Sequence, residues 1–402
     1  MATILFLAHR IPYPPNKGDK IRAWHFLSHL LSKHTVHLGF YVDDKKDLVH
    51  IDYLEGLVSS LCYQEVVPFM QKVRSLSGFV TGKSLTEQAY PHSKLKSYSN
   101  ALLESGEIDL IFLYSAATAP IVPATCQTPV IADLVDVDSQ KWASYATSAW
   151  WPLTYVYNRE ALKLGALERD IAEASSATLL VSQQEADLFT KLNAGCAGNV
   201  KAISNGVDLA HFDATSKGAG ANRTTGDDAL VLFTGAMDYQ PNIEAVVWFC
   251  EHVWPHIRAK APLANFRIAG GPTTPQVDAL AANEGVEVVG YVDNMAEEIA
   301  KATVSVAPLR LARGIQNKVL EAIAMSKPVV ATSPANEGIN AEHDTAILVH
   351  DDAAAFADAV LTVLRDKATG ERLGQAARIF VEENFTWEAS YQQLDGLIDE
   401  LL

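Results

Sequence analysis

The chain has 402 residues, roughly two to three times the usual domain size, and this length predicts two domains. A hydrophobic content of 49% with 20% charged residues excludes a disordered chain, and a formal net charge of −16 argues against nucleic acid as a partner. Because no apolar run reaches the roughly 18 residues of a membrane span, the first residues lack a signal peptide and the four scattered cysteines form no metal or disulfide pattern, we expect a cytoplasmic protein.

The first residues have the pattern of a strand, a loop and a helix. Thr3–Ala8 is apolar enough for a buried strand, and Ile21 opens a row of apolar residues at helical spacing. The loop between them contains Gly18, Asp19 and Lys20. Parallel α/β sheets bind ligands at the carboxyl ends of their strands, so these three residues are candidates for ligand contact. A plain surface turn is the alternative.

Residues 68–98 form a basic and apolar segment inside an acidic chain. Five basic residues accompany a single acidic one, Glu87, and apolar residues such as Phe69 and Val80 lie between them. Such a segment favours contact with anionic lipid headgroups. The alternative is a helix pair that packs on its domain and keeps its lysines in water.

Two further strands are predicted at 109–114 and 129–135, and the second leads into a polar group at its carboxyl end. There, Asp136 or Asp138 is suited to bind a ligand hydroxyl or to accept a proton. An amphipathic helix follows at 155–175, and we expect core packing to account for Trp150-Trp151 just before it. Short strands at 177–181 and 200–203 then complete the first half.

The second half begins after a stretch, residues 214–228, that has no apolar periodicity. Its first predicted strands have glycine at their carboxyl ends, and Gly235, Gly270 and Gly271 there are candidate contacts. Asn242 is predicted to cap the helix at 243–250. A turn role alone is the alternative for each glycine.

Residues 308–332 have the pattern of a phosphate site. A buried strand at 302–308 leads into a glycine turn, a helix at 318–325 and a second strand at 329–331. The start of a helix presents unpaired N–H groups and the positive end of its dipole to an anion. Arg310, Arg313 and Lys318 add positive charge there, and Glu321 is placed to accept bonds from hydroxyls. The alternative is a solvated basic turn with a capping glutamate.

This segment resembles the donor site of the retaining GT-B glycosyltransferases of family four. That family has two glutamates eight positions apart, and Glu321 matches the second, while Arg313 stands in the place of the first. The family also has a histidine where Val135 stands here, followed by an aspartate that Asp136 matches. The variant with GIQNKVLEA is similar to sugar transferases associated with exosortase and exopolysaccharide gene clusters.

The resemblance implies an α/β fold of the GT-B type, with two Rossmann-like domains that face a cleft. We expect an acceptor-side domain at 1–208, a linker at 209–228, a nucleotide-sugar domain at 229–384 and a helix at 385–402 that returns to the N-terminal domain. The implied reaction moves a hexosyl group, with retention, from a nucleotide sugar, UDP- or GDP-linked, to an exopolysaccharide or lipid-linked acceptor. It implies no metal and no cofactor, and the basic segment adds peripheral contact with the inner membrane.

Two roles are assigned to site residues on this basis. We expect Arg313, Lys318, Asp136 and Asp138 to be the catalytic residues, and the resemblance gives Glu321 the ribose hydroxyls of the donor. The remaining donor contacts are expected from the N-terminal loop, the glycine strand ends and the helix start: Gly18, Asp19, Lys20, Gly235, Asn242, Gly270, Gly271, Tyr291, Val292, Arg310, Gly314, Ile315, Gln316, Asn317 and Lys318. A nucleotide-sugar epimerase of the same fold and a non-catalytic sugar-nucleotide-binding protein are the alternative functions.

Overall fold

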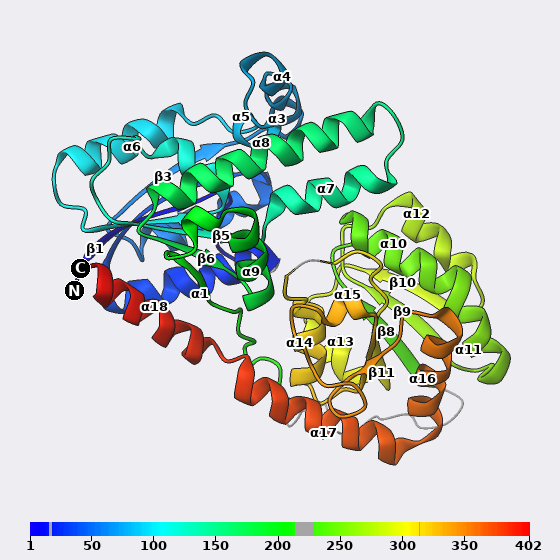
Figure 1. The fold of residues 1–402 in the computed structure, drawn as a ribbon. Coiled ribbons are helices and arrows are strands. Elements are labelled where there is room, and N and C mark those ends of the chain that lie inside the picture. The colour runs from blue at the N-terminus through cyan, green and yellow to red at the C-terminus, as the bar shows by residue number, and fades with distance from the viewer. Residues whose placement is uncertain (16–17, 214–228, 313) are drawn as a thin grey trace. The chain divides into compact units, whose positions relative to one another are not determined.

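The computed structural model describes residues 1–402 apart from 16–17, 214–228 and 313 (Figure 1). Arg313 and most of the predicted linker therefore lie outside the described residues. The chain forms two compact units. Unit 1 comprises Met1–Ser204 with Tyr391–Leu402, and unit 2 comprises Asn205–Ser390.

Unit 1 is built on a seven-stranded parallel sheet with the order β3-β2-β1-β4-β5-β6-β7. Most strands are short runs of buried β-branched and large apolar residues, the pattern of strands covered on both faces. Their bounds are β1 Thr3–Ala8, β2 Thr35–Val42, β3 Ser60–Glu65, β4 Leu110–Tyr114, β5 Val130–Val135, β6 Ala177–Leu180 and β7 Val200–Ala202.

Helices connect these strands and cover the sheet (Figure 1). The predicted amphipathic helix at 155–175 is present as α8. The basic segment 68–98 folds into three short helices and the start of α6, rather than into a helix pair. The bounds are α1 Gly18–Lys33, α2 Ile51–Glu55, α3 Pro68–Ser75, α4 Gly78–Thr81, α5 Leu85–Gln88, α6 Ser93–Glu104, α7 Asp138–Ser148, α8 Leu153–Ala174 and α9 Gln183–Leu192.

A fully buried ion pair joins α1 to the sheet in unit 1. The Arg22 guanidinium donates to both carboxylate oxygens of Asp133 on β5, at 2.7 and 3.1 Å, and to the Ile203 carbonyl at 2.8 Å. Neither side chain is exposed to water. The Arg22 guanidinium carbon also lies 4.6 Å from the ring centre of Phe26. Arg22 is thus a structural residue of the core, although it stands close to the candidate ligand loop.

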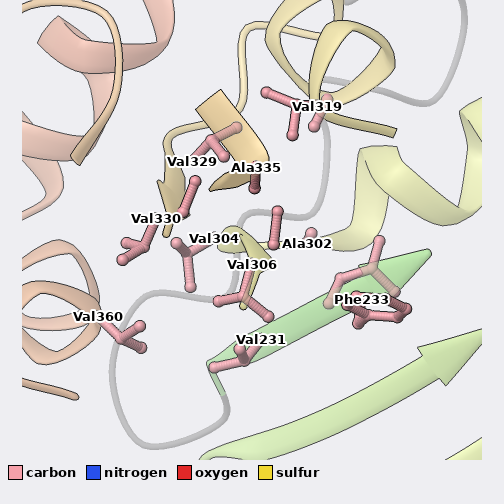
Figure 2. Packing of buried hydrophobic residues seen from close by; sticks show 14 of the residues in the cluster. Val231, Phe233, Ala302, Val304, Val306, Val319, Val329, Val330, Ala335 and Val360 are labelled. Carbon is pink, nitrogen blue, oxygen red and sulfur yellow. The ribbon is translucent and has the colours of Figure 1, made fainter. Parts of the chain in front are cut away.

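Unit 2 is built on a six-stranded parallel sheet with the order β10-β9-β8-β11-β12-β13. Figure 2 shows apolar side chains from β8, β11, β12 and α14, among them Val231, Val306 and Val319, packing in one core. The strand bounds are β8 Leu230–Thr234, β9 Asn265–Ala269, β10 Val286–Gly290, β11 Val304–Ala307, β12 Val329–Ala331 and β13 Leu348–Val349.

The helices of unit 2 follow the strands in alternation. Their bounds are α10 Gln240–Trp248, α11 Trp254–Lys260, α12 Pro275–Asp278, α13 Met295–Lys301, α14 Asn317–Ala324, α15 Ser333–Asn336, α16 Ala353–Arg365 and α17 Lys367–Asn384. The predicted closing helices at 353–364 and 370–382 correspond to α16 and α17.

The last helix, α18 (Trp387–Leu401), begins in unit 2 and ends in unit 1. Within unit 1 it lies alongside α1 (Figure 1). The Tyr391 hydroxyl bonds His25 Nδ1 at 2.8 Å, and Asp395 pairs with His29 at 2.8 Å and with Lys33 at 2.6 Å. The C-terminal helix therefore returns to the N-terminal domain, as predicted.

Two tryptophans depart from the prediction. Trp150 and Trp151 were expected in the core, but their exposed fractions are 72% and 78%. They lie between α7 and α8, at the turn where neither helix covers them. In the part of the chain that the structure describes, no helix is both long and apolar enough to cross a membrane.

Candidate functional site

The carboxyl ends of β8 and β9 meet at two glycines in unit 2. Gly235 has a φ of 152° and Gly270 a φ of 120°, conformations that side chains other than glycine rarely adopt. A Cβ added to Gly270 would lie 2.1 Å from the Gly235 carbonyl oxygen. Glycine is therefore required at this edge because two backbones approach each other there. Gly271 lies against Tyr291 in the same way, with 3.1 Å between an added Cβ and the Tyr291 nitrogen.

Lys318 occupies the space that Gly235 leaves open. Its Nζ donates to the Asn242 Oδ1 and lies 4.8 Å from the ring centre of Phe233. A Cβ on Gly235 would lie 3.2 Å from the Lys318 Nζ and 2.8 Å from the Asn242 Nδ2. The sequence placed Gly235, Asn242 and Lys318 on three separate segments, and the fold brings them together.

Asn242 is not the helix cap that the sequence predicted. Helix α10 begins at Gln240, with Tyr239 at the cap position and Pro241 in its first turn. Asn242 therefore lies inside the helix and is buried, with its Nδ2 donating to the Ala236 carbonyl at 2.8 Å. The helix starts earlier than predicted because proline fits the first helical turn, where its missing N–H costs no bond. Asn242 instead holds Lys318 through its side-chain oxygen.

The charges of this site are poorly solvated. Burial lowers the pKa of Lys318 to about 7, against the raising effect of Glu321. Burial likewise raises the pKa of Glu321 to about 7, against the lowering effect of Lys318. Each charge is thus only partly compensated by the other. An anionic ligand beside Lys318 would supply the missing compensation and favour its charged form.

The first turn of α14 adds backbone donors beside Lys318. Gln316 stands at the cap position, and its side chain makes no capping hydrogen bond to the first turn. Uncapped first-turn N–H groups and the helix dipole favour an anion. Asn317, the first helical residue, accepts a bond from Asn205 Nδ2 at 3.4 Å, and Ile315 packs on the core of unit 2.

The loop before α14 is held by a close backbone contact. Gly314 has a φ of 60° and lies against Gly338, where an added Cβ would be 2.2 Å from the Gly314 carbonyl oxygen. Arg310 donates to the Asp351 carbonyl at 2.9 Å and lies over the Trp248 ring at 4.9 Å. Arg310 and Lys318 therefore contact different residues: Arg310 contacts Asp351 and Trp248, whereas Lys318 contacts Asn242 and Phe233. Tyr291 and Val292 follow β10, and Tyr291 is 73% exposed.

The predicted loop contacts of unit 1 are largely engaged in ion pairs. Gly18 opens α1, and Lys20 is 3% exposed with its Nζ 2.6 Å from Asp47. Asp19 accepts a bond from Arg10 at 2.5 Å. Burial acts to raise the pKa of Asp19, but His9 and Arg10 hold it well below its usual range. Asp19 is therefore an ionised anchor for the two residues that follow β1.

Asp136 and Asp138 lie at the carboxyl end of β5, as predicted. Burial raises the pKa of Asp136 to about 7, and the charges of Asp138 and Glu185 add to the shift. Asp138 opens α7 and lies 3.8 Å from Lys141. A carboxylate with a pKa near neutrality is suited to exchange a proton at physiological pH. Of the two, Asp136 has the electrostatics of an acid/base group.

Sequence reasoning missed His9, which directly follows β1. Its Nε2 lies 3.6 Å from the Asp19 carboxylate and its ring stacks on Tyr114, with 5.7 Å between ring centres. The only signal in the sequence was its place at the end of the first predicted strand, where α/β sheets bind ligands.

Glu168 makes the stability of unit 1 depend on pH. It is 2% exposed and accepts bonds from the Ser139 nitrogen at 3.0 Å and the Ser139 hydroxyl at 2.6 Å. Burial raises its pKa to about 8, although the Ser139 bonds lower it. Because the pKa is raised on folding, the stabilisation is complete below the ordinary pKa and is lost as pH rises through about 8.

We expect Glu168→Gln to remove this loss, because the amide keeps one acceptor and cannot ionise. At pH 8.5 the variant should melt at least about 3 °C above the wild type, and at pH 5 the two should agree within about 1 °C. Thermal unfolding followed by circular dichroism at both pH values measures the difference. A constant offset at both pH values would mean that Glu168 does not titrate in this range.

The comparisons with known proteins agree with this geometry. Residues 228–366 match the sequence model of the family described as glycosyl transferases group 1. The fold is of the GT-B type, and the chain is a glycosyltransferase, as predicted. A curated relative from Klebsiella pneumoniae, described as an uncharacterized 44.6 kDa protein in the cps region, is 20% identical over 96% of this chain and 97% of its own.

Solved structures of similar fold cover nearly the whole chain. Sucrose-phosphate synthase from Thermosynechococcus elongatus has a TM-score of 0.72 at 18% identity, covering 100% of this chain and 99% of its own. Anabaena HepE, solved with UDP and glucose, has a TM-score of 0.67 at 15% identity, covering 99% and 100%. WaaG, a glycosyltransferase involved in lipopolysaccharide biosynthesis, has a TM-score of 0.66 at 11% identity, covering 98% and 99%.

Proposed function

We propose that this protein transfers a hexosyl group from a nucleotide sugar, with retention, to an exopolysaccharide or lipid-linked acceptor. The observation that carries the proposal is the group of Lys318, Asn242 and Glu321 at the start of α14, where the Gln316 side chain makes no capping hydrogen bond. A diphosphate would compensate Lys318 and accept bonds from the first-turn N–H groups. The nucleotide sugar enters as substrate, and no resident cofactor or metal is required.

The rest of the donor follows from the neighbouring strand ends. Glu321 would accept bonds from the ribose hydroxyls, and main-chain groups at Tyr291 and Val292 would receive the base. Arg310 and Arg313 would add positive charge at the loop. UDP is the first choice of nucleotide because HepE was solved with UDP and with UDP-glucose. GDP is the second. The cps-region relative supports a polysaccharide as the product.

In the proposed reaction, the bond from the anomeric carbon to the diphosphate oxygen breaks. The acceptor hydroxyl oxygen then bonds to the same face of that carbon, and its proton passes to the departing diphosphate. Lys318 and the α14 N–H groups stabilise the charge that grows on the leaving diphosphate, and such fixed donors usually provide a large part of the rate gain. Retention rests on the resemblance of the 308–332 segment to family four.

Thermal shifts with nucleotides test the donor site. We expect UDP to raise the melting temperature more than GDP, ADP or TDP do, because a ligand that binds only the folded state stabilises it. UDP should also exceed UMP and uridine, since the diphosphate contacts Lys318. If uridine stabilised the protein as much as UDP does, the site would recognise only the base. The proposed contact between the diphosphate and Lys318 would then be refuted.

A lipid-linked acceptor is supported by an exposed apolar surface on α3 and α4. This surface, called here the α3–α4 face, includes Val80, 91% exposed, and Phe69, 72% exposed. Its other members are Met70, Val73, Leu76 and Phe79. Lys72 and Arg74 lie in the last turn of α3, and Arg159 on α8 holds α4 through the Gly78 carbonyl and the Phe79 ring. Apolar residues with basic neighbours suit an anionic membrane surface.

We expect the double variant Phe69→Glu, Val80→Glu to lower binding to vesicles at least about fivefold, because it places two negative charges at the lipid headgroups. Co-sedimentation with vesicles of phosphatidylglycerol and phosphatidylcholine measures the bound fraction. Val49→Glu is the matched control, since Val49 is 77% exposed and lies outside the α3–α4 face. Equal losses in both variants would show a general charge effect and remove the support for membrane contact.

A further inference from the structure

The turn between α7 and α8 presents a group of apolar side chains to solvent. Trp150 and Trp151 are highly exposed, Tyr155 in the first turn of α8 is 64% exposed, and Leu153 is 38% exposed. These four residues are called here the aromatic tip. Figure 1 shows α7 and α8 side by side, with this turn at one end of the pair. Several large apolar side chains exposed together indicate an interaction surface, whereas a single one does not.

The aromatic tip is held in place by the helices behind it. The rings of Trp142 on α7 and Tyr157 on α8 pack together, with 5.4 Å between their centres. The Tyr145 ring lies 6.0 Å from that of Trp142 and 6.2 Å from that of Tyr157. In the turn itself, the Thr154 N–H donates to the Trp150 carbonyl at 3.2 Å. Because the turn is already ordered, little conformational entropy is lost when its exposed side chains bind a partner.

The segment that carries the tip has no charged side chain. Residues 142–158 contain six aromatic residues and no Asp, Glu, Lys, Arg or His, although 20% of the whole chain is charged. A partner that binds through ion pairs would find no opposite charge on this segment. Tryptophan and tyrosine combine a large apolar ring with one polar group, and they are enriched where lipid headgroups meet the acyl chains. The composition of the tip therefore favours a lipid surface.

The tip adjoins the α3–α4 face along α8. Arg159 on α8 donates to the Lys83 carbonyl at 3.0 Å, and its guanidinium carbon lies 4.8 Å from the ring centre of Phe79 on α4. Tyr155 precedes Arg159 by one helical turn, so it lies on the same side of α8 and about 6 Å away along the helix axis. A basic apolar surface and an uncharged aromatic one are thus neighbours on unit 1. A bilayer fits both, since it offers anionic headgroups and an apolar layer beneath them.

We infer that the aromatic tip inserts at the headgroup boundary of a phospholipid bilayer, as a second membrane contact beside the α3–α4 face. The inference rests on the proposed function, because membrane contact brings the enzyme to a lipid-linked acceptor. The two contacts differ in their physical basis. The α3–α4 face attracts anionic headgroups through its basic residues, so its contribution weakens with salt. The contribution of the tip comes from burial of apolar surface, so it persists at high salt.

Co-sedimentation with vesicles of phosphatidylglycerol and phosphatidylcholine at about 0.5 M NaCl, where the Debye length is roughly 4 Å, tests the tip alone. We expect the wild type to stay partly bound. The double variant Trp150→Ser, Trp151→Ser should lower the bound fraction at least about fivefold, because it removes most of the apolar surface that would be buried. The matched control is Ile379→Ser, since Ile379 is 55% exposed and lies on α17 in unit 2. The control should bind as the wild type does.

Tryptophan fluorescence gives a second measurement of the same contact. Vesicles with brominated acyl chains should quench the emission of the wild type, and the quenching should fall at least about fivefold in Trp150→Ser, Trp151→Ser. The inference is overturned if binding at high salt and quenching are equal in the two proteins, or if the wild type does not bind at high salt. It is also overturned if neutral dextran, and not vesicles, changes the wild-type emission, since the tip would then bind glycan. A wild-type dimer that becomes a monomer in the double variant on gel filtration would make the tip an interface between copies.

The melting-temperature shift with UDP separates this inference from the proposed function. The tip lies in unit 1, whereas the proposed diphosphate contacts lie in unit 2, so the double variant should keep the wild-type shift. A wild type that binds vesicles through the tip but shows no shift with any nucleotide diphosphate would count against the donor site and not against the tip. A wild type with the UDP shift and no salt-resistant vesicle binding would count against the tip and not against the donor site.

Discussion

Replacing Lys318 with methionine should lower the rate of nucleotide release from UDP-glucose at least about a hundredfold, while the protein keeps its fold. Methionine has a similar length and no charge, so it can pack on Phe233 without binding a phosphate. Lys318 is the cation that Asn242 holds at the start of α14. Its positive charge is therefore lost at the point where negative charge develops. Initial rates of UDP release, with and without an acceptor extract, measure the effect.

The control for this variant is Lys301→Met. Lys301 lies in unit 2 and is 55% exposed, with its Nζ 2.7 Å from Glu298. The Lys301→Met variant should keep the wild-type rate of UDP release. Melting temperatures should change little in either variant, because Lys318 already bears a desolvation cost in the folded protein. If Lys318→Met kept the wild-type turnover, the assignment of Lys318 as a diphosphate contact would be refuted.

Replacing Arg22 with methionine should destabilise unit 1 by about 3–5 kcal/mol. The substitution leaves the Asp133 carboxylate buried without its partner, since neither side chain of the pair is exposed. Burial already raises the pKa of Asp133, and the Arg22 charge opposes that rise. Equilibrium unfolding in urea, followed by circular dichroism, measures the loss as a lower midpoint of the transition that includes unit 1.

The double variant Arg22→Met, Asp133→Leu separates a lost pair from a lost side chain. Replacing both charges by apolar groups of similar size removes the unpaired carboxylate, so the double variant should recover most of the stability. If the single and double variants were equally destabilised, packing around Arg22 would be the cause. A loss below about 1 kcal/mol in the single variant would mean that water reaches Asp133.

Much of the sheet could be predicted because buried parallel strands have a simple pattern. Thr3–Ala8 is β1 without a change of boundary, and the predicted strands at 109–114 and 129–135 differ from β4 and β5 by one residue. The strand predicted at 302–308, before the phosphate segment, is present as the shorter β11, Val304–Ala307. Continuous apolar runs with glycine or polar ends are enough to place such strands.

The wrong predictions concern residues whose burial or position depends on contacts with other parts of the fold. The exposure of Trp150 and Trp151 follows from the absence of any covering element over the α7–α8 turn among the described residues, and no local pattern contains that information. Asn242 was misplaced because a cap and a first-turn residue carry the same side-chain types. The stacking of His9 on Tyr114 joins segments far apart in the chain, so composition could not reveal it.

The last helix has a consequence for synthesis on the ribosome. Residues 391–402 belong to unit 1, whose other residues end at Ser204, so the whole of unit 2 is made in between. The surface of α1 that receives Tyr391 and Asp395 thus stays open to water until the final turns of α18 emerge. We expect unit 2 to acquire protease resistance first on stalled nascent chains, with unit 1 completed only afterwards.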